Sequence, residues 1–459
     1  MMEDCMTNNY DLTTGSIGKK LLLFFLPIAV GTLFQQLYNT VDAMVVGKFV
    51  GTEALAAVGG SAAMVIALFI GFFVALTGGA SAVIAQLAGA RLDASVSRAT
   101  HSAFTFSIGA GLLLILIGIP LTPALLRWMN TPADTMTDSI LYLRIYFGGS
   151  VFMLFFNMGS SILQATGDSR HPLYYLIICC FCNIVLDLLF VVVFRMGIAG
   201  AACATVISQL ISSLLILQRF CRTKSACHLD LRQLRIDPGL TKRMLAIGIP
   251  AGLQASMYNL SNLIIQVAVN SLLTVAVAAW SVSSKVDGFY SSISTALGIA
   301  VMGFVGQNYG AGKTDRVKKT LKTSLKIFLP VTLSLTIFVL LFGQFGLTIF
   351  IDDPAVIEAT RVILWYLAPF YVVWTFIEIV SGALRGVGDA FIPLVITGIG
   401  ICVLRLIWVY GVFPFFHTIA GLTLCYPVSW MLTAVALVIH YHKQGWSSRS
   451  KKLPDSPSL

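Results

Sequence analysis

The sequence predicts an all-α integral membrane protein with twelve transmembrane helices in two parallel-repeat six-helix lobes. Three observations predict this fold: the composition, a series of apolar stretches and an internal repeat. Hydrophobic residues make up 57% of the 459 residues, charged residues only 11%, and the mean hydropathy is +0.87. Soluble domains carry about 25% charged residues, so the composition excludes an ordinary soluble domain.

Apolar stretches recur along the whole chain. Each is long enough to cross a hydrocarbon layer about 30 Å thick as a helix of about 20 residues. The first six are expected at residues 20–46, 54–78, 101–120, 139–163, 172–194 and 198–219. The second six are expected at residues 244–269, 275–303, 325–347, 360–384, 391–413 and 420–442.

The two halves of the chain share short motifs in the same order. The repeated pairs, all at one offset of 221 residues, are Gly167 and Gly388, Asp168 and Asp389, Pro172 and Pro393, and Gln86 and Gln307. Six spans per half is an even number, so each half begins and ends on the same side of the membrane. The repeats are therefore parallel, and parallel repeats of membrane helices are typical of secondary transporters.

Polar segments divide the chain into five parts. We expect an N-terminal tail at 1–19, an N-lobe at 20–219, a linker at 220–243, a C-lobe at 244–442 and a C-terminal tail at 443–459. The linker is the longest polar segment and is basic. A turn at its Asp-Pro-Gly sequence precedes the seventh span.

The net charge of +10 follows the expected topology. When alternate loops are assigned to alternate sides, most Lys and Arg residues fall on the side that holds the N-terminus, and only Lys285 and Arg405 lie inside spans. The positive-inside rule places both termini in the cytoplasm. We therefore expect a multi-pass monomer among the lipids of a bacterial cytoplasmic (inner) membrane, with no nucleic acid partner.

Motifs for metal, cofactor or enzyme chemistry are not apparent in the sequence. The nine cysteines have no metal-site spacing with supporting histidines. Signatures such as Gly-x-Ser-x-Gly, His-Glu-x-x-His and the phosphate-binding loop are missing, so neither an enzyme nor an ATP-driven pump is indicated. We expect no metal site and no cofactor.

Polar side chains in the N-terminal half interrupt three apolar spans. An ionisable residue in a membrane helix is costly and is a functional candidate. Gln35, Asn39 and Asp42 are spaced to share one helix face, and Asn183 and Asp187 are one turn apart. Two simpler interpretations stay open: solvation of Asp42 at the helix end, and a structural hydrogen-bonded pair for Asn183 and Asp187.

Three further polar residues could complete a chamber in this half: Tyr142, Asn157 and Thr205. Such residues are also common in hydrogen bonds between membrane helices, and this alternative remains open.

Charged residues in the C-terminal half form a second group of candidates. Lys285 and Asp287 are two residues apart on one span and cannot face each other. Arg405 is expected to neutralise Glu378 or Asp287. An internal ion pair and a role in transport are equally open here.

Buried carboxylates without catalytic machinery suit ion exchange. A carboxylate that loses water favours its neutral form. Its proton can be displaced by Na⁺ or by an organic cation, and competition for one carboxylate couples opposite fluxes. H⁺ or Na⁺ is thus the expected coupling ion.

The chain resembles the multidrug and toxic compound extrusion (MATE) family over about residues 15–445. The residues that carry the resemblance in the first half are Pro27, Gln35, Asp42, the segments 54–57 and 86–90, and Gly167 with Asp168. Their counterparts in the second half are Pro250, the segments 276–279 and 307–311, and Gly388 with Asp389.

The resemblance implies two six-helix lobes that alternate between inward- and outward-open states. It implies export of cationic or amphipathic compounds, chiefly small-molecule organic cations, driven by H⁺ or Na⁺. Asp42, Asn183 and Asp187 match the positions of a proton-linked site in some members, with Tyr142, Asn157 and Thr205 lining the same chamber, beside Gln35 and Asn39.

Other members of the family use acids in spans seven, eight and ten. Here the seventh span offers Gln254, Tyr258, Asn259 and Asn262 but no acid. Asp287 and Glu378 keep a site in the C-lobe open, with Lys285 and Arg405 as further candidates.

Two other functions are compatible with parts of the sequence. A lipid-linked oligosaccharide flippase of the same superfamily would need basic residues around its cavity. An intramembrane aspartyl protease would use the Gly-x-Gly-Asp motif that ends at Asp389, although a turn followed by an Asp helix cap explains that motif more simply.

Overall fold

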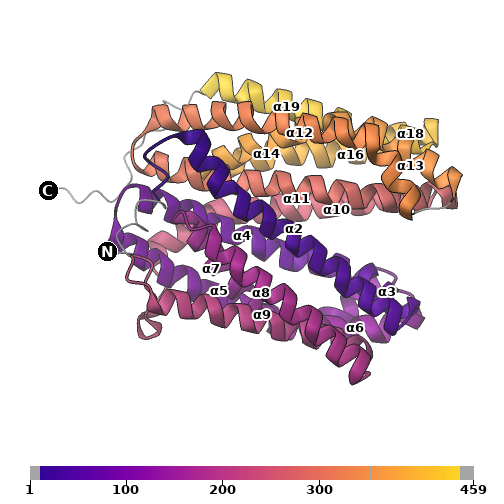
Figure 1. Cartoon of the computed structure of the whole chain (residues 1–459), viewed down its shortest axis with the longest axis horizontal. Coiled ribbons are helices and arrows are strands. Elements are labelled where there is room, and N and C mark those ends of the chain that lie inside the picture. The colour runs from indigo at the N-terminus through magenta and orange to yellow at the C-terminus, as the bar shows by residue number, and fades with distance from the viewer. Residues whose placement is uncertain (1–10, 351–352, 445–459) are drawn as a thin grey trace. The chain divides into compact units, whose positions relative to one another are not determined.

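The computed structural model describes residues 11–350 and 353–444, whose regular structure is helical, with no β-strand among them (Figure 1). The expected tails at 1–19 and 443–459 fall largely outside the described residues. The prediction of an all-helical membrane protein is confirmed.

The first half of the chain is a series of long helices with short connections. They are α2 (Ile17–Phe49), α3 (Thr52–Ala57), the π-helix η1 (Val58–Ala62), α4 (Ala63–Gly89), α5 (Asp93–Trp128), α6 (Ala133–Gly148), α7 (Ser150–Ala165), α8 (Arg170–Asp187), the π-helix η2 (Leu188–Val193) and α9 (Gly197–Arg222). A short 3₁₀ turn, η3 (Leu231–Gln233), follows before the second half.

The second half has the same character. Its helices are α10 (Pro238–Asn270), α11 (Thr274–Gly310), α12 (Thr314–Phe350), α13 (Pro354–Leu367), η4 (Ala368–Phe370), α14 (Tyr371–Gly386), α15 (Phe391–Thr397), η5 (Gly398–Val403), α16 (Leu404–Ile407), η6 (Trp408–Val412), α17 (Phe413–Phe416), α18 (Ile419–Thr423) and α19 (Cys425–Gln444). Of these, η5 and η6 are π-helices.

Ten continuous helical segments in the described residues are long and apolar enough to span a membrane. The pair α6 and α7, which is bent by 51° at Gly149, provides an eleventh. The helix α10 stands where the seventh span is expected and is 33 residues long, but Gln254, Asn259 and Asn262 make it more polar than the others. The order of the segments agrees with the predicted series.

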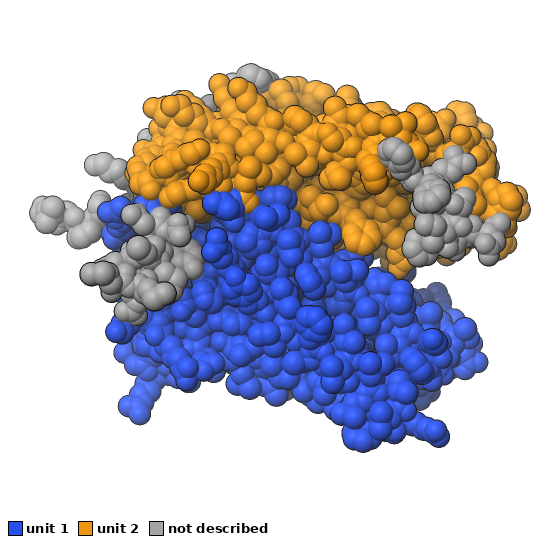
Figure 2. Space-filling model, in the orientation of Figure 1, with its two compact units in different colours: residues 1–11, 23–256 blue, residues 12–22, 257–459 orange. Residues whose placement is uncertain are grey.

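The chain divides into two compact units, shown in Figure 2. Among the described residues, unit 1 contains residue 11 and residues 23–256, and unit 2 contains residues 12–22 and those from 257 onward. The divisions fall inside α2 and α10, each of which has a proline near the change of unit, Pro27 and Pro250. A proline inside a helix removes a backbone hydrogen bond and favours a bend.

Small residues let the helices of unit 1 pack closely. An added Cβ at Gly111 of α5 would lie 2.6 Å from the Val151 Cα of α7. The Ser150 hydroxyl also donates a hydrogen bond of 3.0 Å to the Gly111 carbonyl. Close backbone approach of this kind stabilises helix pairs in lipid.

The repeated Gly-Asp motif forms the same turn in both units. Gly167 and Gly388 have φ angles of 94° and 95°, which glycine adopts without steric cost. Asp168 Oδ1 accepts hydrogen bonds from the backbone N–H groups of Arg170 and His171, both at 3.2 Å. Asp389 Oδ1 accepts one from Ile392 N–H at 3.3 Å, so both aspartates cap the following helix.

The segment before α2 is bound to unit 2. Its residue Leu12 is 2% exposed, and the Leu12 N–H donates to Gln307 Oε1 at 3.0 Å. The Arg316 guanidinium donates to the carbonyls of Leu12, Thr14 and Gly15 at 3.3, 2.9 and 2.8 Å. These bonds anchor the N-terminal end of α2.

Candidate functional site

Asp42, Asn183 and Asp187 lie together in the interior of unit 1. Asp42 comes from α2 and is 8% exposed, while Asn183 and Asp187 come from α8 and are 0% exposed. The carboxyl groups of Asp42 and Asp187 interact with each other. Two acids from helices distant in sequence therefore share one buried site.

In the described part of the chain, no basic residue neutralises this pair. Among the described residues, no Lys, Arg or His nitrogen lies within the 4.0 Å ion-pair distance of either carboxylate. Asp42 Oδ1, both Asp187 oxygens and both polar atoms of the Asn183 amide are buried without a hydrogen-bond partner within 3.5 Å. Buried polar atoms are normally satisfied, so this group has capacity for a cation, a proton or water.

Three tyrosines lie near enough to the two acids to interact with their charge. Tyr142 interacts with both carboxyl groups, and Tyr38 and Tyr146 interact with Asp42. The Tyr142 and Tyr146 ring centroids are 5.9 Å apart. Tyrosine rings near a buried acid pair suit an organic cation.

The helix geometry changes at the site. Asp187 is the last residue of α8, and the π-helix η2 begins at Leu188. A π-helix widens the helical turn and leaves backbone groups without their usual partners, and it is frequent at functional sites. In Figure 1, α8 and α9 run side by side, and α9 brings Thr205 to the Tyr38 hydroxyl, which donates to Thr205 Oγ1 at 3.4 Å.

The remaining predicted chamber residues have different environments. Thr205 is buried and contacts Tyr38, which links it to the acids. Gln35 and Asn39 are exposed, although they share the general face of α2 that leads to the buried Asp42. Asn157 donates from its amide to the Met153 carbonyl of its own helix at 2.9 Å.

Tyr38 and Tyr146 were not among the residues predicted from the sequence. Tyr38 lies one helical turn before Asp42, and Tyr146 lies one turn after Tyr142. The four-residue spacing from residues already singled out is the signal that identifies both.

The acids of unit 2 are arranged differently from expectation. Glu378 forms its ion pair with Arg385 on the same helix, with Nη2 3.7 Å from Oε2. The expectation that Arg405 neutralises Glu378 is therefore wrong. Glu378 and Arg385 are two helical turns apart on α14, and both pack over Gly298 of α11, where the missing side chain leaves room for them.

Arg405 is 4% exposed and donates from Nη1 to Asn262 Oδ1 at 3.0 Å. Its guanidinium lies over the Tyr426 ring, 3.8 Å from the centroid. Asp287 interacts electrostatically with Arg405 but forms no ion pair with it within 4.0 Å. Lys285 is exposed on the same helix as Asp287.

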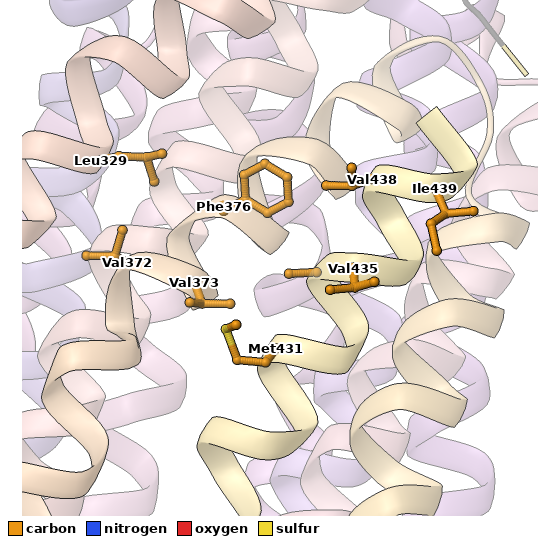
Figure 3. Close-up of a pocket in the computed structure, with 9 residues that line it drawn as sticks. Leu329, Val372, Val373, Phe376, Met431, Val435, Val438 and Ile439 are labelled. Atoms are coloured by element: carbon orange, nitrogen blue, oxygen red, sulfur yellow. The ribbon is translucent and has the colours of Figure 1, made fainter. Parts of the chain in front are cut away.

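An apolar groove of about 330 Å³ lies elsewhere in unit 2 (Figure 3). Its walls come from α12, α14 and α19, and the lining residues are Leu329, Val372, Val373, Phe376, Met431, Ala434, Val435, Val438 and Ile439. Several of these side chains are about half exposed, among them Val435 at 51% and Ile439 at 48%. The groove has the character of a surface in contact with lipid.

Comparisons with known proteins agree with this architecture. The MatE family model matches residues 27–189 and 250–410. The chain is 29% identical over 389 residues to the Probable multidrug resistance protein YoeA of Bacillus subtilis, covering 83% of this chain and 84% of that protein. It is 27% identical to a FAD transporter of Shewanella oneidensis, covering 94% and 96%.

A solved structure has the same fold. The crystal structure of a MATE protein in complex with MaL6 superposes with a TM-score of 0.88 at 22% identity, covering 95% of this chain and 97% of that chain. The two matched segments of the family model correspond to the two sequence halves that carry the repeat.

Proposed function

This chain belongs to the MatE family of membrane transporters, and from that premise we propose that it is a secondary active multidrug efflux antiporter. It exports cationic or amphipathic compounds by alternating access, in exchange for H⁺ or Na⁺. The similarity to proteins named for multidrug resistance supports small organic molecules as the cargo.

The observation that carries the proposal is the buried pair of Asp42 and Asp187 without a basic partner. Two neighbouring carboxylates repel each other when both are ionised, and burial adds to the cost of their charge. Such a pair favours the uptake of one positive charge. A proton, Na⁺ or an organic cation can each provide that charge.

Competition for this pair couples the two fluxes. When H⁺ or Na⁺ occupies the carboxylates, an organic cation loses its electrostatic partner and leaves. When the ion is released, the negative pair attracts the next organic cation, and Tyr38, Tyr142 and Tyr146 offer ring faces to its apolar parts. The Asn183 amide offers both a donor and an acceptor, which suits either form of a carboxyl group.

We propose the bacterial cytoplasmic membrane as the location, with both termini on the cytoplasmic side. The distribution of Lys and Arg residues supports this orientation. A monomer with two repeat-related units is sufficient for the mechanism, because the acid pair is complete within unit 1.

The two other functions considered from the sequence have less support. The two basic residues that the sequence placed within spans do not line a large basic cavity in the described residues: Lys285 is exposed and Arg405 is packed against Tyr426. Arg385 of α14 is paired with Glu378. That arrangement gives no support to a flippase for pyrophosphate-linked sugars. Asp389 acts as a helix cap, which accounts for the protease-like motif without catalysis.

The test is drug resistance in a sensitive host. Asp42→Asn and Asp187→Asn each remove a carboxylate while keeping its size, so each variant should lose resistance at unchanged protein level in the membrane. Asp230→Asn, in the linker outside the membrane-spanning helices, is the matched control and should retain resistance. Full resistance in both site variants would refute the role of the pair.

A further inference from the structure

The helix of unit 2 that corresponds to α8 carries a cation in place of acids. At the 221-residue offset, Asn183 corresponds to Leu404 and Asp187 to Trp408, so the two acid-site positions of α8 are apolar or aromatic in unit 2. The neighbouring Arg405 is buried instead. The charge at this level of the repeat is thus inverted between the two units.

Arg405 stands at a distorted part of its helix. The short α16 lies between two π-helices, η5 and η6. The acid site of unit 1 likewise adjoins a π-helix, η2. Because π-helical turns are frequent where a membrane or soluble protein builds a site, both halves place their buried charge at such a turn.

The Arg405 guanidinium is incompletely satisfied. It has five N–H donors. Nη1 bonds to Asn262, and the ring of Tyr426 covers one face of the group. Nε is buried without a partner, and no carboxylate lies within 4.0 Å among the described residues. A charge in this position has a strong preference for an anion.

Aromatic rings extend away from this charge. Tyr426 and Trp430 of α19 are 5.6 Å apart in an edge arrangement, and Trp430 lies 5.5 Å from Trp374 of α14. Tyr258 of α10 lies 5.6 Å from Trp374. Trp430 Nε1 is also buried without a hydrogen-bond partner. The rings form a continuous aromatic surface beside a cation.

The cluster is accessible at one side. Asn262, the hydrogen-bond partner of Arg405, is exposed, and Tyr258 and Trp374 are partly exposed. All of these residues belong to unit 2. A ligand can therefore reach this cluster from the side on which Asn262 is exposed.

We propose that unit 2 holds a second binding site, for planar aromatic compounds that carry an anionic group such as a carboxylate or phosphate. Arg405 and Asn262 bind the anionic group, because the guanidinium fork matches the geometry of two anionic oxygens. Trp374, Trp430 and Tyr258 contact the planar ring system. Asp287 lies near the guanidinium but forms no ion pair with it within 4.0 Å.

The site is separate from the one in the proposed function. It uses no residue of unit 1, and its ligands have the opposite charge to those that Asp42 and Asp187 attract. A negative result for the proposed anion site therefore does not decide the role of Asp42 and Asp187, and the reverse also holds.

A pair of dyes with one skeleton and opposite charge provides the experiment. Carboxyfluorescein and rhodamine 6G share a planar xanthene ring system, and the first is anionic while the second is cationic. Binding of each to the purified full-length protein in detergent is measured by fluorescence anisotropy, with empty micelles as the blank.

We expect the wild-type protein to bind both dyes. Arg405→Gln should weaken carboxyfluorescein binding by at least about tenfold, because a buried charge partner is lost, and leave rhodamine 6G binding unchanged. Arg405→Lys should weaken carboxyfluorescein binding less than Arg405→Gln does, since the positive charge remains but the two parallel guanidinium donors are lost. Asp42→Asn should weaken the binding of rhodamine 6G and leave that of carboxyfluorescein unchanged.

Rhodamine 6G binding also reports whether a variant is folded. If Arg405→Gln binds neither dye, Trp374→Leu tests the proposal instead. The Trp374 ring is partly exposed, and its loss should weaken the binding of carboxyfluorescein but not that of rhodamine 6G. The proposal is overturned if the wild type does not bind carboxyfluorescein, if Arg405→Gln binds it as tightly as the wild type, or if Trp374→Leu weakens both dyes in parallel.

Discussion

Asp42 of α2 and Asp187 of α8 bring their carboxyl groups together inside unit 1, and within residues 11–350 and 353–444 neither is paired with a basic residue. Glu378 and Arg385 show the contrasting solution in unit 2, where a buried acid has a cation on its own helix. An acid with a fixed basic partner stabilises the structure. An acid pair without such a partner can bind and release a proton, Na⁺ or an organic cation.

The hydroxyl of Tyr142 is expected to assist this exchange. Tyr142 is 4% exposed and interacts with both carboxyl groups. Tyr142→Phe keeps the ring and removes one polar partner, so efflux of a fluorescent cation should slow by roughly two- to tenfold, the equivalent of about 0.5–1.5 kcal/mol. Tyr174→Phe changes an exposed tyrosine of α8 and should have no effect. Equal slowing in both variants would show that the effect is not specific to the site.

Two glycines of α5 provide a matched test of helix packing. A Cβ at Gly111 would lie 2.6 Å from the Val151 backbone, while a Cβ at Gly109 would meet nothing within 4 Å. Gly111→Ala should destabilise the protein by about 1–3 kcal/mol through overpacking. Gly109→Ala should be neutral or slightly stabilising. Thermal unfolding in detergent measures both, and a similar midpoint for the two variants would contradict the close contact.

The bonds from Arg316 should control the order of the segment before α2. Arg316→Ala removes three hydrogen bonds to the carbonyls of residues 12–15, whereas Lys318→Ala changes an exposed side chain on the same helix. Hydrogen exchange at the Leu12 amide should accelerate in the first variant and stay at the wild-type rate in the second. An unchanged rate in Arg316→Ala would mean that the bonds from Gln307, Asn308 and Lys313 hold the segment without Arg316.

Cys227 should react slowly with maleimides at neutral pH. Burial raises the pKa of this linker thiol to about 11, because the low-dielectric surroundings disfavour the charged thiolate. An ordinary thiol has a pKa of about 8.5, so at pH 8 the reactive thiolate fraction of Cys227 is smaller by on the order of a hundredfold. Reactivity should rise as the pH approaches the raised pKa.

The control for Cys227 is a thiol two residues away. In a background without other cysteines, Ser225→Cys places a thiol at an exposed position of the same linker. It should be labelled rapidly at pH 8 while Cys227 is not. Comparable labelling rates for the two positions would contradict the burial of Cys227.

The sequence alone was sufficient to identify the two acids of the site one by one. A carboxylate in an apolar helix is rare enough to identify Asp42 and Asp187 individually, and the helical period relates Asp187 to Asn183. The turn at Gly167 and Gly388 could also be predicted, because glycine followed by aspartate suits a left-handed residue before a helix cap.

Pairings between helices could not be obtained in this way. Arg405 contacts Asn262 and Tyr426, which lie on α10 and α19, and nothing in the local pattern of any one helix encodes which neighbours meet. Glu378 was paired incorrectly because its partner, Arg385, stands two turns away on its own helix and was assigned to a loop. The exposure of Gln35 and Asn39 likewise depends on neighbouring helices.

Efflux from proteoliposomes with a pH gradient or a Na⁺ gradient, each imposed alone, tests the central claim most directly. The wild-type protein should move a cationic dye against its gradient under at least one of the two conditions. Asp42→Asn and Asp187→Asn should abolish that gradient-driven movement. Gradient-driven transport at the wild-type rate in both variants would contradict the account.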